Sequence, residues 1–219
     1  MPSLSDAHSR FHDELGLWTW IRSEPFDKPR AALFLDRDGV IIEDPGYLCD
    51  PAAMIVIPGA ARLIASANQL GVPVVVITNQ AGIGRGYYGW NEFIQVEEAL
   101  MSMLAAEDAH LDAVLACPYH RDGVPPWNHP QHPARKPAPG MFLAADQFLH
   151  LDLSQSWIVG DSWSDLLAGY HAGLRGGTHV LTGKGVKHRP KVIEWQPRNF
   201  DLQLADSISS VGALLRTIK

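Results

Sequence analysis

Five short runs rich in apolar residues divide the chain, and polar residues follow most of them directly. An unbroken apolar run such as residues 31–35 is typical of a strand that is buried on both faces of a parallel sheet. The five runs cover residues 31–35, 73–77, 112–117, 157–159 and 178–181. We predict that each of them forms a strand of one core sheet.

Segments with apolar residues at three- and four-residue steps lie between these runs. This spacing places the apolar side chains on one face of an amphipathic helix. The predicted helices cover residues 59–70, 93–104, 141–148 and 165–172, and a last helix with Asp206 as its N-cap covers 206–218. Alternating strands and helices favour right-handed parallel crossovers. We therefore predict an α/β fold, a Rossmann-like parallel sheet with helices on both faces.

The N-terminal residues 1–30 precede this alternation. Apolar residues at three- and four-residue steps after Ser5 and Asp6 predict an amphipathic helix over residues 5–23, and Pro25 and Pro29 make the following segment a linker. We expect this helix to pack on the outside of a single domain formed by residues 31–219. A dimer contact through Trp18 and Trp20 is the alternative.

Two connecting segments have unusual composition. Residues 81–89 are rich in glycine and are predicted to form a loop at the rim of a site rather than a helix. Residues 118–134 contain five prolines, which break any regular pattern. Long loops in compact domains are usually functional, so we expect residues 118–134 to form a partial lid.

Composition and charge narrow the function classes. The chain has 219 residues, of which 46% are hydrophobic, and this length favours one well-buried domain. A net charge of −6 argues against a general nucleic-acid binder or a membrane-surface protein. Only Cys49 and Cys117 are present, so no disulfide framework is indicated. With neither a signal peptide nor a membrane span in the sequence, we expect a cytoplasmic protein that is a monomer or a weak homodimer.

Carboxylates gather where the predicted strands end. Asp36 and Asp38 follow the first strand, and Asp161 and Asp165 follow the fourth. The carboxyl ends of parallel strands meet at one edge of the sheet, where open α/β folds bind ligands. Two carboxylates leaving a strand can reach one divalent cation, while one of them attacks phosphorus. The alternative is a solvated turn in which both side chains only cap backbone N–H groups.

The order of these residues resembles that of a known family. The set consists of Asp36 and Asp38, Thr78, Lys136, and Asp161 with Asp165. It is similar to the haloacid dehalogenase superfamily of phosphohydrolases over about residues 31–183. Within that superfamily, residues 35–39, 44–47, 78–86 and 135–141 resemble the histidinol-phosphate and heptose-bisphosphate phosphatase branch, and the heptose-bisphosphate enzymes more closely.

The resemblance implies a role for each residue of the set. Asp36 would be the nucleophile that forms an aspartyl-phosphate, and Asp38 would be the general acid and base. Mg²⁺ would be bound by Asp36, the Asp38 backbone and Asp161. The phosphoryl group would be bound by Thr78, Asn79 and Lys136. Asp165 would orient Lys136, and substrate contacts are expected from Asp44, Tyr47, Arg85 and Arg135.

Cap domains of this superfamily are inserted after the first motif or between the second and third. The segment between Asp38 and Thr78 is already used by a turn, a helix and a strand, so no separate cap domain fits there. Residues 118–134 would then be the only partial lid. The site would be open to a small phosphorylated sugar, and we expect neither nucleic acid nor a membrane as a partner.

Two positions depart from the pattern of the family. Its members bind zinc with a Cys-x-His and a Cys-x-Cys sequence, whereas here only Cys117 matches. A rebuilt zinc site could consist of Cys117, His120, His129 and His132, which have suitable ligand chemistry. The favoured alternative is that the prolines fix the loop without a metal. Ser162 stands where the heptose enzymes usually carry a lysine, which leaves the substrate open between heptose bisphosphate and histidinol phosphate.

A receiver-like signalling module is the alternative of another class. Such a module also uses Asp, Thr and Lys around Mg²⁺ to retain an aspartyl-phosphate. Asp38 favours the enzyme, because an acid and base two residues after the nucleophile accelerates dephosphorylation, which a stored signal must avoid.

Overall fold

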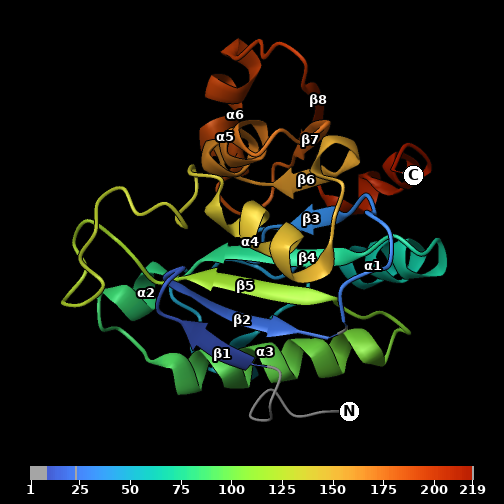
Figure 1. The fold of residues 1–219 in the computed structure, drawn as a ribbon. Coiled ribbons are helices and arrows are strands. Elements are labelled where there is room, and N and C mark those ends of the chain that lie inside the picture. The colour runs from blue at the N-terminus through green and yellow to red at the C-terminus, as the bar shows by residue number, and fades with distance from the viewer. Residues whose placement is uncertain (1–8, 23, 219) are drawn as a thin grey trace.

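One mixed sheet runs through the computed structural model, which describes residues 9–22 and 24–218 (Figure 1). Its strand order is β1-β2-β5-β4-β3-β6-β7-β8. The strands are β1 (Ser9–His12), β2 (Leu17–Ile21), β3 (Leu33–Leu35), β4 (Val74–Asn79), β5 (Ala113–Cys117), β6 (Trp157–Gly160), β7 (Gly176–His179) and β8 (Asp201–Leu204). The strands from β3 onward pair in parallel, with β3 between β4 and β6. The predicted Rossmann-like α/β fold is confirmed, and antiparallel strands extend one edge of it.

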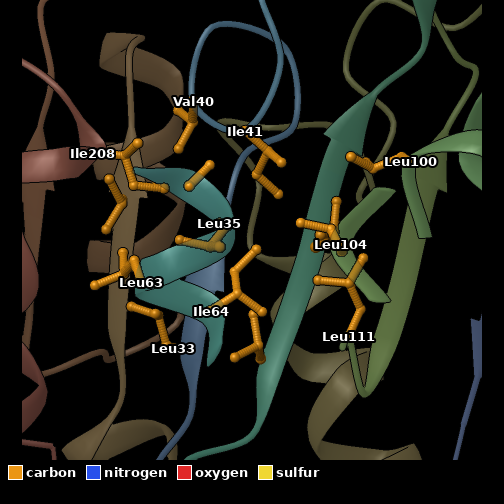
Figure 2. Packing of buried hydrophobic residues seen from close by; sticks show 14 of the residues in the cluster. Leu33, Leu35, Val40, Ile41, Leu63, Ile64, Leu100, Leu104, Leu111 and Ile208 are labelled. Carbon is orange, nitrogen blue, oxygen red and sulfur yellow. The ribbon is translucent and has the colours of Figure 1, made fainter. Parts of the chain in front are cut away.

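Helices cover both faces of this sheet. The α-helices are α1 (Ala60–Gln69), α2 (Ala81–Gly84), α3 (Trp90–Ala105), α4 (Gly140–Leu149), α5 (Trp163–His171) and α6 (Gly185–Glu194). Leu33 and Leu35 pack with residues of α1 and α3, whereas Phe34 between them packs with α4 and α5. Figure 2 shows the first of these two cores, in which Ile64 of α1 lies beside Leu33 and Leu35 of β3, and Leu104 of α3 lies near Leu100 and Leu111. Burial of each such side chain stabilises the fold by about 1.5–3 kcal/mol.

The N-terminal segment forms a hairpin and not the predicted helix. β1 pairs antiparallel with β2, and β2 pairs antiparallel with β5. Residues 17–20 are all buried, a pattern that suits a strand between two layers and not one face of a helix. Residues 5–8 of the predicted helix lie outside the described part of the chain. Trp18 and Trp20 are buried within the domain, 4% and 5% exposed, so they offer no dimer contact.

The C-terminal segment also differs from its prediction. Residues 206–218 contain two short 3-10 helices, η3 (Ile208–Ser210) and η4 (Gly212–Arg216), instead of one α-helix. Ser207, and not Asp206, caps η3 with its side chain. Packing decides this conformation, because Ile208, Leu214 and Leu215 are buried in the core beside α1. The sequence interpretation also missed α6 and β8, which follow β7.

Residues 118–134 form a loop as predicted, whereas the prediction that residues 81–89 contain no helix is wrong. Residues 81–84, expected as loop, form the short helix α2, where the buried Gly82 and Gly84 allow close contact with Tyr88 and the Pro118 carbonyl. Residues 118–134 contain no helix or strand and leave the sheet at the carboxyl end of β5 (Figure 1). Residues 39–73 contain only one 3-10 helix, η1 (Pro51–Ala53), and α1, so no separate cap domain is inserted there.

Candidate active site

Three buried carboxylates converge at the carboxyl edge of the central strands. Asp36 follows β3, Asp161 follows β6, and Asp165 lies in the first turn of α5. Their ligand atoms lie within 4.8 Å of one another, and no other group of three such side chains was found in the described chain. The adjacent parallel pairing of β3 with β6 brings these segments together.

Lys136 compensates part of this negative charge. Its Nζ lies 2.9 Å from Asp36 Oδ1 and 2.8 Å from Asp165 Oδ1, and it donates to the Ile77 carbonyl at 2.9 Å. Burial alone would lower the pKa of Lys136, but the two carboxylates raise it above its ordinary value. Lys136 therefore remains an ammonium group. Asp165 contacts Lys136 as the sequence predicted.

The charge of the cluster remains unbalanced after this pairing. Burial first, and then the neighbouring Asp165 and Asp38, raise the pKa of Asp36 to about 7, although Lys136 opposes the shift. Burial, Asp36 and Asp165 raise the pKa of Asp161 to about 8. Clustered, buried carboxylates with raised pKa values are typical of a functional site, and a bound cation would favour their charged form.

A divalent metal fits this donor set. Asp165 already uses both oxygens, Oδ1 on Lys136 and Oδ2 as acceptor from the Ser162 N–H. Asp36 and Asp161 are thus the better ligands, and hard carboxylate oxygens suit Mg²⁺. The backbone approaches closely here, because a Cβ on Gly39 would collide with Asp161 Oδ2, and Gly39 has a φ of +86°. The chain is therefore shaped around the Asp161 carboxylate.

Asp38 points into a separate polar network. Arg37 Nη2 lies 2.9 Å and 3.0 Å from the two Asp38 carboxylate oxygens, and Arg37 Nη1 lies 2.6 Å from Glu97 Oε1. Gln80 Nε2 donates to Asp38 Oδ2 at 2.9 Å. Since Arg37 and Glu97 are buried, their pair fixes the guanidinium from behind. The Asp38 side chain is 19% exposed and faces the cavity.

Thr78 and Asn79, two of the predicted phosphate contacts, have different neighbours. Thr78, at the end of β4, has its hydroxyl 3.4 Å from Asp38 Oδ2 and 2.7 Å from Gln80 Nε2. Asn79 binds the backbone of Lys136 on both sides, donating to its carbonyl and accepting from its N–H, each at 3.1 Å. Asn79 thus positions Lys136 in addition to lining the cavity.

These residues surround one cavity of about 380 Å³ at the carboxyl edge. Of the expected substrate contacts, Asp44, Tyr47 and Arg135 line it. Arg85 is not among the lining residues, but its Nη1 donates to the Tyr47 hydroxyl at 2.8 Å. Arg85 therefore contacts the lining residue Tyr47 without lining the cavity itself.

Several lining residues were missed by the sequence analysis. They are Gln80, Tyr88, Ser164 and Lys184. Ser162 and His120 also line the cavity, although the sequence analysis considered them only as a lost lysine position and a zinc ligand. Lys184 had a detectable signal, since it follows a predicted strand end, as Asp36 and Asp161 do. Its Nζ lies 2.7 Å from Asp44 Oδ2, and its backbone N–H donates to Asp161 Oδ2 at 2.6 Å.

The rebuilt zinc set is not assembled. Cys117, His120, His129 and His132 do not form a group of three or more ligands within the described chain. The His132 ring stacks on Tyr119 with centroids 3.7 Å apart, and His129 packs edge-on against it. Burial raises the pKa of the Cys117 thiol to about 12, so the thiol is protonated in this arrangement.

None of the helices in residues 9–22 and 24–218 combines the length and the apolar character needed to cross a bilayer.

Comparison with known proteins agrees with this site. The HAD-hydrolase-like family model matches residues 133–210. A D-glycero-beta-D-manno-heptose-1,7-bisphosphate 7-phosphatase of Mesorhizobium japonicum is 48% identical over 204 residues, 93% of each chain. The crystal structure of a HAD-like phosphatase from Mesorhizobium loti has a TM-score of 0.83 and 42% identity, covering 95% of both chains.

A second solved structure is that of D,D-heptose 1,7-bisphosphate phosphatase from B. bronchiseptica, complexed with magnesium and phosphate. It has a TM-score of 0.73 and 28% identity, and the match covers 85% of this chain and 98% of that one. The identity and coverage of these relatives, together with the carboxylate cluster at the expected strand ends, establish the family. The chain belongs to the haloacid dehalogenase superfamily, as a phosphatase of its heptose-bisphosphate phosphatase branch.

Proposed function

We propose that this phosphatase removes the 7-phosphate of D-glycero-β-D-manno-heptose 1,7-bisphosphate. The observation that carries the proposal is the pairing of Asp36 with Lys136 beside Asp161, in a cavity whose rim carries further polar and basic side chains. A relative of that name is 48% identical to this chain over 93% of its length. Within residues 9–22 and 24–218 no separate domain closes the edge of the cavity, which leaves space for a sugar.

Asp36 is the proposed nucleophile. One of its oxygens forms a bond to phosphorus while the bond between phosphorus and the sugar oxygen breaks, which gives an aspartyl-phosphate. Asp36 Oδ1 is fixed by Lys136 and by the Arg37 N–H at 2.8 Å. Fixed donors of this kind orient the carboxylate and stabilise the charge of the transferring group.

Asp38 is the proposed acid and base. It gives a proton to the departing sugar oxygen and then takes one from the water that attacks phosphorus, which releases phosphate and regenerates Asp36. Gln80 and Arg37 position its carboxylate at the cavity wall. Thr78 lies beside it as a hydroxyl donor for a phosphoryl oxygen.

Asp36, the Asp38 backbone and Asp161 would bind Mg²⁺. When bound, Mg²⁺ supplies positive charge that stabilises the phosphoryl oxygens and lowers repulsion between them and Asp36. The raised pKa values of Asp36 and Asp161 support a cation here.

The test is phosphate release by purified protein with Mg²⁺. The substrates are the β and α anomers of heptose 1,7-bisphosphate and histidinol phosphate, and Asp36→Asn is the blank. We expect the highest kcat/KM with the β anomer and a loss of at least about a thousandfold in Asp36→Asn. A higher kcat/KM with histidinol phosphate would overturn the substrate. Unchanged activity in Asp36→Asn would overturn the mechanism, and a long-lived phosphorylated protein without turnover would favour a signalling module.

A further inference from the structure

The cavity offers few cations to a second phosphate. Two of its basic residues, Arg37 and Lys136, are 1% and 3% exposed and are saturated by carboxylates. Arg135 Nη1 donates to the Tyr119 carbonyl at 2.8 Å, which leaves its other guanidinium N–H groups for a ligand, but the side chain is only partly exposed. Lys184 differs, because its side chain is 59% exposed while it lines the cavity. Its ammonium group is therefore accessible to substrate.

Lys184 is anchored at both ends. Its backbone N–H donates to Asp161 Oδ2 at 2.6 Å, so its side chain starts beside the carboxylate cluster. Its Nζ lies 2.7 Å from Asp44 Oδ2, and the Asp44 side chain is only 6% exposed. An ammonium group has three donors, so this pair leaves donors for another anion.

The neighbouring position carries no charge. Ser162 directly follows Asp161, and its hydroxyl lies 2.7 Å from His188 Nδ1 in α6. Lys184 immediately precedes that helix. The cation on this side of Asp161 thus comes from the segment after β7 and not from the residue after Asp161.

We propose that Lys184 determines specificity by binding the phosphate that is not transferred, and that Asp44 keeps its ammonium group in place. The inference rests on the proposed function, in which the substrate carries two phosphates. An ammonium contact to a phosphate is a charge-assisted hydrogen bond, and its loss is expected to change affinity by about tenfold to a hundredfold.

The test compares heptose 1,7-bisphosphate with heptose 7-phosphate, which lacks the second phosphate. In Lys184→Met the ratio of the two kcat/KM values is expected to fall about tenfold or more toward the monophosphate. Lys187→Met is the matched control, because Lys187 is exposed in α6, which begins directly after Lys184, and does not line the cavity. It should leave the ratio unchanged.

Lys184→Met leaves the Asp44 carboxylate without its ion-pair partner, which itself can disturb the site. The double variant Asp44→Asn/Lys184→Met therefore removes both charges. The ratio should remain low in this variant. An unchanged ratio would overturn the proposal. If the kcat/KM values for both substrates fell equally, the pair would have a structural role. Failure of the proposed function is distinct, since the wild-type protein would then release no phosphate from the bisphosphate.

Product binding gives a second readout. Heptose 1-phosphate carries only the phosphate that is not transferred, so its affinity depends on that contact. Titration calorimetry with Mg²⁺ should show a Kd about tenfold higher in Lys184→Met than in wild type. An equal Kd would contradict the assignment.

Discussion

Glu97 and Arg37 are a buried ion pair behind the reacting groups. Glu97 is 0% exposed in α3, and its Oε1 lies 2.6 Å from Arg37 Nη1. Burial raises the pKa of Glu97, and Arg37 opposes the shift. The same guanidinium fixes Asp38. Glu97 therefore acts on Asp38 through Arg37, as a positioning residue.

Glu97→Gln tests this chain of contacts. The amide keeps a hydrogen-bond acceptor but leaves the buried Arg37 with one carboxylate instead of two. We expect the free energy of unfolding to fall by about 1–3 kcal/mol and kcat to fall more than KM changes. Denaturant unfolding and steady-state kinetics measure the two effects.

Glu107→Gln is the control for this substitution. Glu107 is exposed and lies just after α3. The free energy of unfolding of Glu107→Gln should therefore change by less than about 0.5 kcal/mol. If Glu97→Gln lost stability with an unchanged kcat and pH profile, the pair would be structural only and the link to Asp38 would be wrong.

At the scale of elements, the N-terminal hairpin packs against residues 118–134. Phe11 lies edge-on to Trp127 with centroids 5.1 Å apart, and Trp127 contacts Tyr119. Gly16, in the hairpin turn, lies against the rings of His132 and Tyr119. Aromatic packing thus holds residues 118–134 against the hairpin.

Gly16→Ala is expected to loosen this loop. Its φ is +63°, and an added methyl group would collide with the His132 ring. Since Arg135 donates to the Tyr119 carbonyl, displacement of Tyr119 should also raise KM. We expect a loss of at least about 1 kcal/mol beyond the backbone strain alone, measured by thermal unfolding, together with faster proteolysis within residues 118–134.

Gly71→Ala measures that strain separately. Gly71 has a φ of +71° with nothing within 4 Å of an added Cβ. The free energy of unfolding of Gly71→Ala should fall by about 1–2 kcal/mol, and its KM should be unchanged. Equal losses in the two variants, with equal KM, would show that the hairpin does not fix the loop.

The sequence predicted the elements whose pattern is local and strong. Strands such as β3 and β4 are unbroken apolar runs, and the polar residues at their ends marked Asp36, Thr78 and Asp161 as neighbours. The hairpin was missed because Phe11, Leu15, Trp18 and Ile21 also fit a helical period. Pairing of β2 with the edge of β5 outweighs that local pattern.

Helix α6 and strand β8 were not predicted, because their sequences carry no clear apolar pattern. Helix α6 contains Pro190 and buries only Gly185 and Val192, so no apolar stripe is visible in its sequence. β8 is mostly exposed at the sheet edge. The contacts of Lys184 with Asp44 depend on how the segment after β7 meets the loop after β3, which spacing along the chain does not encode.

At the scale of the whole molecule, the carboxylate cluster couples stability to pH and to metal. The pKa values of Asp36 and Asp161 are raised to about 7 and about 8, above their unfolded values. The folded state therefore binds more protons than the unfolded state at any pH between the ordinary carboxyl pKa of 3.8 and the raised values. The free energy of unfolding therefore falls as the pH rises toward the folded pKa values, by up to about 1.4 kcal/mol per pH unit for each of the two groups.

Mg²⁺ should offset this loss. In EDTA, Tm is expected to fall from about pH 6 to about pH 8.5, and the increase in Tm on adding Mg²⁺ should be larger at the higher pH. Asp161→Asn should flatten both dependences. An Mg²⁺ effect of equal size at the two pH values would show that protons and metal do not compete for this cluster.

Asp36 is expected to form a covalent bond to the transferred phosphate. The most direct measurement uses Asp38→Asn with ³²P-labelled p-nitrophenyl phosphate, whose leaving group needs no proton, followed by acid quenching. We predict label that hydroxylamine releases, located on the peptide that contains Asp36. Consumption of the ester with label on another residue, or with no covalent label, would contradict the account.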